Sequence, residues 1–315
     1  MEDDSRNNIM NSHNDDINFY ELFQALLDGK WIILSVTAFI SIAAVIYSLS
    51  LPDIYKSEAL LVPVEGKDSF ASGLQGYSSL ASFAGISLPA NAGDSNAAKS
   101  IEKLKSLSFF ENNILPNINL QELMALRSWN SLNNTLEFDK TIFDSETNSW
   151  LTEDYSEEAQ IPSIQMSFKR FKEQHLDIMQ DSKTGFITLS IKHKSPFIAQ
   201  KWNALLVDEI NSYYRTKDKV EAEKAISFLN DQIASTSLTQ IKQVLAELLQ
   251  KETEKLTLTE ANELYVFDYI DPASVMEEKS EPQRALICIL YAVFGFMISI
   301  IIVFIKYYRS DTKNS

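Results

Sequence analysis

Cysteine and histidine are scarce in this chain of 315 residues, with one and three copies. The one cysteine, Cys288, lies inside an apolar run, which excludes a disulfide framework and clusters of cysteine ligands around a metal ion. His13, His175 and His193 are isolated in the sequence, so we expect surface or strand-end positions for them. No H-E-x-x-H, G-x-S-x-G or G-x-x-x-x-G-K-[ST] motif occurs. We therefore predict no catalytic residue, no cofactor and no metal site.

One pair of short motifs fits a particular enzyme class. Ser100-Ile-Glu-Lys103 matches S-x-x-K and Lys183-Thr-Gly185 matches K-T-G, as in serine acyltransferases that act on cell-wall peptides. The accompanying S-D-N motif does not occur, and K-T-G falls in a predicted hairpin turn, where turn chemistry explains Gly185. The sequence therefore favours a structural role for both motifs.

Positive charge is scarce as well, with 28 Lys and Arg against 43 Asp and Glu and a formal net charge of −15 at pH 7. Most of the excess acid lies between two long apolar runs near the ends of the chain. Nucleic acid and anionic lipid are therefore poor partners for this middle segment.

The two apolar runs, residues 31–51 and 285–305, carry no charged side chain. Each contains the roughly 20 apolar residues that a membrane-spanning helix needs, so we predict two transmembrane helices. The alternative for each is a buried core helix, although uncharged stretches of this length are rare in soluble domains. Two spans place both termini on one side of the membrane. Basic residues near the run ends are balanced between the two sides and do not set the orientation.

The predicted domains follow from these spans. Residues 1–30 form a tail, 31–51 and 285–305 the spans, 52–284 the large domain, and 306–315 a second tail. Near the end of the first tail, five apolar residues share one helical face, which predicts a short helix that lies in the membrane interface or simply extends the first span. They are Phe19, Leu22, Phe23, Leu26 and Leu27.

The fold class predicted for residues 52–284 is α+β, with a mixed sheet of about four strands packed against helices. Residues 66–98, rich in small residues, read as a loop. Ser195-Pro196 is a strong helix start, with serine as N-cap and proline at the first helical position. The other expected elements are strands at 54–63, 175–180, 186–193 and 265–270 and helices at 97–113 and 163–173.

Residues 196–264 are predicted to form a long helical hairpin that breaks at 235–237. The charged bands 215–219 and 251–255 lie at similar distances on either side of Thr236, so they are expected to meet across the hairpin. Chance similarity of two helices is the alternative. The projecting apolar surface must be covered by the partner helix or by other subunits. We expect it to include Ile226, Leu229, Ile233, Leu238, Ile241, Leu245 and Leu248.

Small residues recur in both apolar runs. Gly295 and Ser299 lie four positions apart, and so do Ala44 and Ser48. Such small-xxx-small faces let transmembrane helices approach closely, so we predict that these four residues pack the two spans together. Simple adaptation to the lipid is the alternative.

Several blocks of the chain form a recognisable series. They are INFYELFQALLDGKW (17–31), SSLASFAGISLP (78–89), KSIEKLKSLSFFE (99–111), QDSKTGFITLSIKHKSPFIAQKWNALLVDEIN (180–211), EAEKAISFLNDQIA (221–234) and IDPASVMEEKSEPQRALI (270–287). Each block alone is weak, but taken in order between two spans they resemble the Wzz-type O-antigen chain-length determinants, the polysaccharide co-polymerases of bacterial lipopolysaccharide synthesis. The last block has only Pro272 and Pro282, where family members are often richer in proline.

This resemblance implies a two-pass protein of the bacterial inner membrane, with cytoplasmic termini and a periplasmic α/β base that carries a long projecting helix. It implies a ring-like homo-oligomer without enzymatic activity. Such a protein sets the modal number of O-antigen repeats that a separate polymerase adds to a chain on an undecaprenyl pyrophosphate carrier. Two alternatives are a regulator of capsule or exopolysaccharide export that works with a tyrosine kinase, and a periplasmic sensor.

Overall fold

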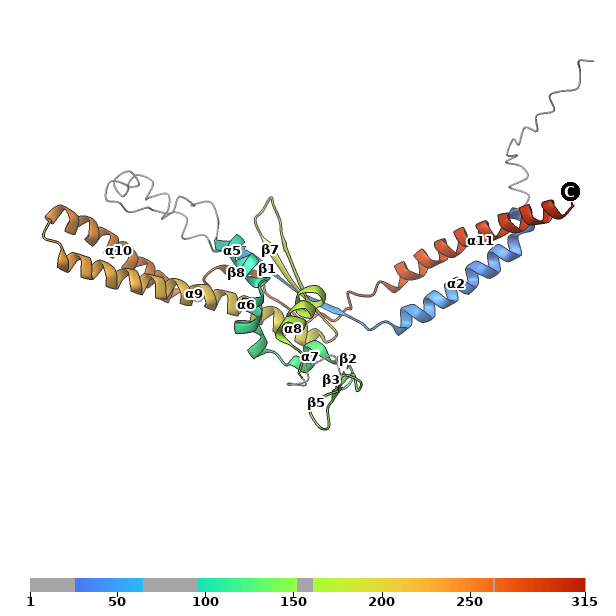
Figure 1. Ribbon diagram of the computed structural model, residues 1–315, viewed down its shortest axis with the longest axis horizontal. Coiled ribbons are helices and arrows are strands. Elements are labelled where there is room, and N and C mark those ends of the chain that lie inside the picture. Colours follow the sequence, from blue (N-terminus) through green and yellow to red (C-terminus); the bar gives the residue numbers. More distant parts are fainter. Residues whose placement is uncertain (1–25, 65–95, 152–160, 263, 315) are drawn as a thin grey trace, which may run out of the picture. The chain divides into compact units, whose positions relative to one another are not determined.

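The computed structural model describes residues 26–64, 96–151, 161–262 and 264–314 (Figure 1). These residues form two compact units, one from the stretches up to Leu51 and from Pro282 onward, the other from Pro52 to Glu281. His13, most of the predicted interfacial helix and most of the predicted loop 66–98 lie outside the described residues.

The first unit consists of two long apolar helices, α2 (Lys30–Ser50) and α11 (Arg284–Asn314). They pack side by side, and the rings of Tyr47 and Tyr291 lie 6.5 Å apart between centroids. Both are long and apolar enough to cross a membrane. Most of their large apolar side chains are exposed, as expected of a span and unlike a core helix. α11 continues beyond the predicted end at residue 305 because neither glycine nor proline follows.

The second unit is built on a four-stranded sheet with the order β6-β7-β1-β8. Its strands are β1 (Tyr55–Pro63), β6 (Leu176–Gln180), β7 (Ile187–His193) and β8 (Phe267–Asp271). All neighbouring pairs are antiparallel, so the predicted mixed sheet is wrong, whereas the α+β class is confirmed. The helical hairpin between β7 and β8 explains the difference. It returns the chain to the Pro63 end of β1, so β8 must run against β1.

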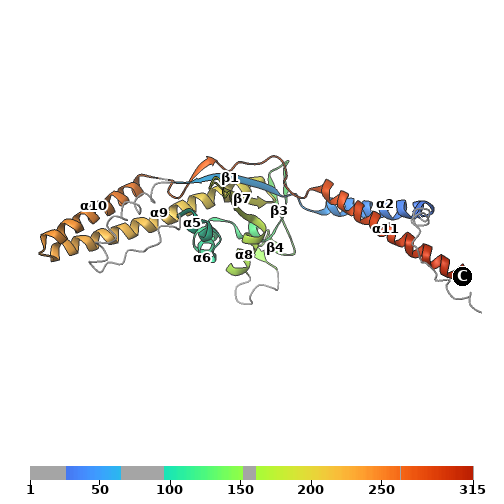
Figure 2. The same cartoon turned by 90° about the horizontal axis from the view of Figure 1, so that it is seen from above.

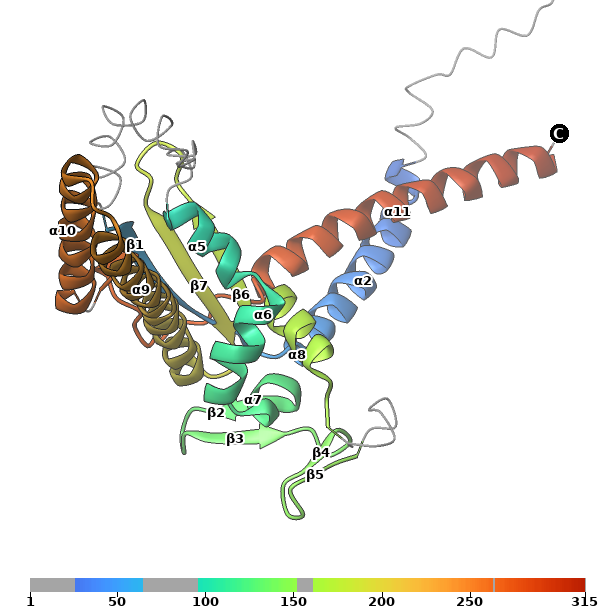
Figure 3. The ribbon, with the colours of Figure 1, turned by 60° about the vertical axis from the view of Figure 1, so that its left-hand side comes forward.

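Helix α9 (Pro196–Ser235) lies across one face of this sheet, as Figure 3 shows. Its first half buries Trp202, Leu206 and Ile210 in the core together with Leu189 and Ile191 of β7. The predicted start at Ser195-Pro196 is confirmed. Beyond the sheet, α9 continues with α10 (Thr239–Ala261) beside it, which confirms the helical hairpin (Figures 1 and 2).

The predicted register of the charged bands is wrong. Lys219 of the first band forms an ion pair with Glu260, several positions beyond the second band at 251–255. Residues 236–238 belong to neither helix. The residue of α10 that faces a given residue of α9 therefore lies further along the chain than a turn centred on Thr236 would place it.

Short elements fill the stretch between β1 and β6. The predicted helix 97–113 is interrupted, because the Ser106 side chain accepts a hydrogen bond from Phe109 N and caps a new helix. The helix predicted from residue 163 is confirmed, with Ser163 as its N-cap. The elements are α5 (Asn96–Leu104), α6 (Leu107–Phe109), η1 (Phe110–Ile114), η2 (Leu115–Asn117), α7 (Leu120–Met124), β2 (Leu126–Asn130), β3 (Thr135–Phe138), β4 (Phe143–Asp144), β5 (Ser149–Trp150), α8 (Ile164–Arg170) and η3 (Phe171–His175).

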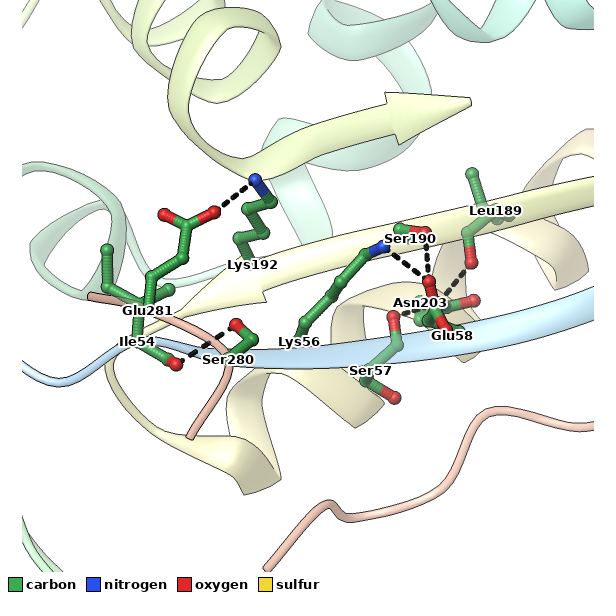
Figure 4. A network of polar contacts seen from close by, with 10 residues as sticks. All are labelled: Ile54, Lys56, Ser57, Glu58, Leu189, Ser190, Lys192, Asn203, Ser280 and Glu281. Carbon is green, nitrogen blue, oxygen red and sulfur yellow. Dashed lines mark hydrogen bonds and ion pairs between the residues drawn. The ribbon is translucent and has the colours of Figure 1, made fainter. Parts of the chain in front are cut away.

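Two buried asparagines bind α9 to the sheet. The amide of Asn203 donates to the carbonyl oxygens of Ser57 in β1 and Leu189 in β7, both at 2.9 Å (Figure 4). Two turns further on, Asn211 binds the backbone around the start of β8. Its side-chain oxygen accepts from three consecutive N–H groups, residues 265–267, and its amide donates to Phe267 O. Buried polar groups that lose such partners destabilise the fold.

We predict that Asn211→Ala destabilises the protein by at least about 2 kcal/mol, because it leaves several buried backbone groups without a partner. Denaturant unfolding of the detergent-solubilised chain, followed by circular dichroism, would measure this. The matched control is Asn230→Ala, which alters an exposed asparagine of the same helix and should change stability by less than about 0.5 kcal/mol. Equal stability losses in the two variants would contradict the anchoring role of Asn211.

Candidate functional site

The described residues contain no group of three or more His, Cys, Asp or Glu that could hold a metal ion. The S-x-x-K and K-T-G motifs have structural explanations. Ser100 is fully buried, and the Lys103 ammonium donates to Ser108 Oγ at 3.0 Å and lies 4.7 Å from the centre of the Tyr213 ring. Gly185 closes the β6–β7 turn with a φ of +74°.

A pair of histidines lies where β6 begins and β7 ends. Their ring centroids are 5.3 Å apart, and both rings contact Trp202. His193 Nδ1 accepts from Ser195 N, which assigns the proton to Nε2, and this atom donates to Glu122 O. His175 Nδ1 lies 2.7 Å from Lys192 O and donates to it. Both residues mark strand ends, as predicted, but His193 is buried rather than on the surface.

The environment keeps both histidines neutral. Burial lowers the pKa of His175 from 6.5 to about 4, and the nearby positive charge of Arg170 adds to the effect. Burial lowers the pKa of His193 to about 3, and its proximity to His175 contributes in the same direction. Neither group is therefore suited to exchange protons near neutral pH.

The two chain segments that leave the second unit are joined. Ile54 N donates to Glu281 O at 2.9 Å, and Ser280 N returns a bond to Ile54 O at 2.9 Å. The Lys192 ammonium lies 2.6 Å from the Glu281 carboxylate, which connects this pair to β7 (Figure 4). We call these residues, with a further ion pair beside them, the exit clasp: Asp53, Ile54, Lys192, Lys279, Ser280 and Glu281. Sequence reasoning did not identify the clasp because its segments are far apart in the chain.

The structure buries all four small residues predicted to pack the spans: Ala44, Ser48, Gly295 and Ser299. The closest neighbour of Gly295 is Ile40, whose Cβ would lie 3.1 Å from a Cβ built at Gly295. Ser299 Oγ donates to Phe296 O one turn back, so its hydroxyl is satisfied within α11. Whether this packing serves the function stays a prediction.

The residues predicted for the hairpin surface fall into two groups. Leu229 is buried and Ile226, Ile233, Leu245 and Leu248 are partly buried, whereas Leu238 and Ile241 are exposed. Val244, which belongs to the same apolar pattern, is exposed as well, and the structure adds the exposed Phe228, which the pattern did not single out. The hairpin therefore covers its inner apolar positions itself and leaves an apolar outer surface open to a partner.

Together these features define a class of protein. Its α+β base carries a long helical hairpin, and the chain enters the base from one candidate membrane span and leaves it into another. A family model described as "Chain length determinant protein", Wzz, matches residues 15–114. This part of the chain includes α2, β1 and the helices up to η1. The match confirms, over residues 15–114, the resemblance to the chain length determinant family that was seen in the sequence.

Among solved structures, the chain is similar to a "full-length bacterial polysaccharide co-polymerase", with 13% identity, 93% coverage of this chain, 99% of that one and a TM-score of 0.39. It is also similar to a fragment of the polysaccharide co-polymerase WzzB from Salmonella Typhimurium, with 14% identity, 73% and 100% coverage and a TM-score of 0.30. These scores are too low to support a functional conclusion. No curated protein matches the chain.

The histidine pair predicts a loss of stability in acid. An unfolded histidine binds a proton below its pKa of 6.5, whereas the folded pKa values are about 4 and 3. The unfolded state therefore binds more protons between these values, and stability falls as the pH is lowered from 6.5 toward 4. The shift of His175 alone corresponds to roughly 3 kcal/mol.

Unfolding midpoints measured between pH 7.5 and about 4 would test this expectation. The decline should be shallower in His193→Asn, which removes one titrating group whatever its effect on stability at neutral pH. An identical pH dependence in the variant and the natural chain would show that the pair does not titrate as described.

Proposed function

We propose that this protein is a non-enzymatic regulator of O-antigen chain length in lipopolysaccharide synthesis. The observation that carries the proposal is the match of residues 15–114 to the chain length determinant family. It is supported by the architecture around that segment, with candidate spans near both ends and a helical hairpin between them. A regulator of this kind acts on a separate polymerase and needs no catalytic group or cofactor of its own.

The proposed topology places both termini in the cytoplasm and residues 52–284 in the periplasm of a bacterial inner-membrane protein. The exit clasp supports the part of this topology in which both spans are reached from one side of the membrane, because it brings together the two segments that connect the base to its spans. Both connections thus leave the base at one end of the sheet, beside Tyr55 and His193, which are paired across β1 and β7.

In the proposed mechanism, several copies form a ring, and the exposed apolar surface of each hairpin contacts a neighbouring subunit. Leu238, Ile241 and Val244 near the turn are between 45% and 60% exposed, which a single subunit would leave in contact with water. The ring organises the polymerase, or the growing polysaccharide on its undecaprenyl pyrophosphate carrier, and biases when extension stops.

Deletion of the protein should leave polymer synthesis intact but abolish the preferred length of the O-antigen. Gel separation of lipopolysaccharide from the deletion strain would show an even ladder in place of a modal cluster, and a plasmid copy should restore the cluster. Disappearance of the polymer would contradict a regulatory role. An unchanged cluster with altered capsule or exopolysaccharide would assign the protein to another polymer.

Gly295→Leu should disturb length control while the protein still inserts into the membrane. A leucine side chain would overlap Ile40 and force α2 and α11 apart, at a cost of about 1–3 kcal/mol. Gly295→Ala, which requires Ile40 to move by only a few tenths of an ångström, should have a milder effect.

The matched control for Gly295→Leu is Ala43→Leu, which adds the same side chain to an exposed position of α2. Length distributions on gels and protein amounts in purified membranes are the measurements. If Gly295→Leu and Ala43→Leu gave the same modal length as the natural chain, the helix contact would have no part in length control.

A further inference from the structure

The β2–β3 hairpin carries an unusually exposed leucine at its tip. Leu132 is 91% exposed, more than Phe39 on the candidate span α2, at 75%. A single exposed leucine needs no explanation in itself, because many apolar atoms lie on protein surfaces. The surroundings of Leu132, however, combine three features that together indicate what covers it.

First, the turn that presents Leu132 satisfies several of its own polar groups. Asn130 Oδ1 accepts from Leu132 N at 2.9 Å, and the Trp129 indole donates to Asn134 Oδ1 at 2.8 Å. Asn134 takes the left-handed conformation, with a φ of 50°, that completes the turn. These groups would therefore lose little on leaving water, whereas an unsatisfied turn could not enter an apolar environment.

Second, the tip is uncharged although the chain is strongly acidic. Residues 128–136 contain no Asp, Glu, Lys or Arg, in a chain with a net charge of −15. The flanking Arg127 and Glu137 lie at the base of the hairpin, where Ser128 Oγ donates to the Glu137 carboxylate at 2.6 Å. No charge would have to be desolvated if the tip itself entered a low-dielectric environment.

Third, the tip lies beside the point where the chain continues into a candidate span. Ser131 and Trp129 line a small pocket together with Pro52 and Tyr55. Pro52 directly follows Leu51, the C-cap of α2, so only one Cα–Cα step of about 3.8 Å separates the wall of this pocket from the end of that helix. The tip therefore lies beside the segment through which the base is connected to α2.

The aromatic residues around this pocket are of the kind found at membrane interfaces. Trp129 meets Tyr55 edge-to-face, with ring centroids 5.4 Å apart, and Phe197 at 5.9 Å. Phe197 is itself 47% exposed. Tryptophan and tyrosine concentrate at the headgroup level of bilayers because one part of each side chain is apolar and the other forms hydrogen bonds.

We propose that the tip of the β2–β3 hairpin, residues 128–136, docks on the surface of the bilayer that α2 and α11 cross. Leu132 enters the boundary of the acyl chains, and Trp129 lies at the level of the headgroups. The tip adds a third attachment to the two spans and limits how far the base can tilt. This surface depends on the two helices crossing a bilayer and not on the proposed role in length control.

Site-directed spin labelling of the full chain tests the proposal. The background is Cys288→Ser, and the label is placed on Asn133→Cys so that Leu132 is retained. In nanodiscs of phosphatidylethanolamine and phosphatidylcholine, accessibility to oxygen reports lipid and accessibility to a nickel chelate reports water. At position 133 we expect the accessibility to oxygen to exceed the accessibility to the nickel chelate, as at the lipid-facing control Phe39→Cys. Ser182→Cys, in the β6–β7 turn at the other end of the sheet, should show the reverse.

Replacing Leu132 with a charged residue tests whether this leucine holds the tip at the membrane. Leu132→Asp, combined with the label at position 133, should raise nickel accessibility to about the level measured at position 182. Leu132→Ile keeps an apolar side chain and should leave the label in lipid. Both variants alter an exposed residue without core contacts, so neither should affect folding, which circular dichroism would verify.

Three outcomes would overturn the proposal. Nickel accessibility at position 133 equal to that at 182 in the chain with Leu132 would place the tip in water. Exclusion of both reagents would mean that protein, such as a second copy of the chain, covers it. The same accessibility with Leu132 and with Asp at this position would show that the leucine does not hold the tip at the membrane.

Discussion

The contact between α9 and the sheet is the interaction on which the rest of the base depends. Asn203 binds β1 and β7 at once, and Asn211 binds the backbone at the start of β8, so one helix joins three of the four strands. Between these two points, Leu206 and Ile210 are fully buried. Buried amides that satisfy backbone groups allow little variation in position, because any shift leaves polar atoms unpaired in an apolar surrounding. The direction of α9, and hence that of the hairpin it begins, follows from this contact.

The surfaces proposed to act in function lie toward opposite ends of the same helix. The start of α9 is next to His193, the exit clasp and the aromatic residues around Trp129, where the chain passes to its candidate spans. Its far half carries the exposed Phe228 and leads to the exposed apolar residues of the turn and of α10, Leu238, Ile241 and Val244. A rigid helix of 40 residues can transmit a position from one end to the other. This geometry suits the proposed role, in which the protein acts by arranging its partners.

Much of the architecture could be predicted from local patterns. The helix start at Ser195, the break near Thr236 and the β6–β7 turn with Gly185 all depend on the conformational preferences of a few adjacent residues. Predictions that required distant contacts were less accurate. The direction of β8, the register of Lys219 with Glu260 and the burial of His193 are decided by packing between segments far apart in the chain. Of the candidate site, the small residues of the spans were identified, whereas the exit clasp and Leu132 were not.

The two apolar runs, the long helical hairpin and the family resemblance can be recognised without a structure, because hydrophobic periodicity and turn residues act within a few positions of the chain. Which apolar side chains remain exposed, and which polar groups meet, is established only in the folded chain. Exposure of Leu132 and the joining of Ile54 to Glu281 depend on the positions of segments that no local pattern connects. Burial and hydrogen bonding are properties of the packed chain, since each requires a partner that the fold must first bring within reach.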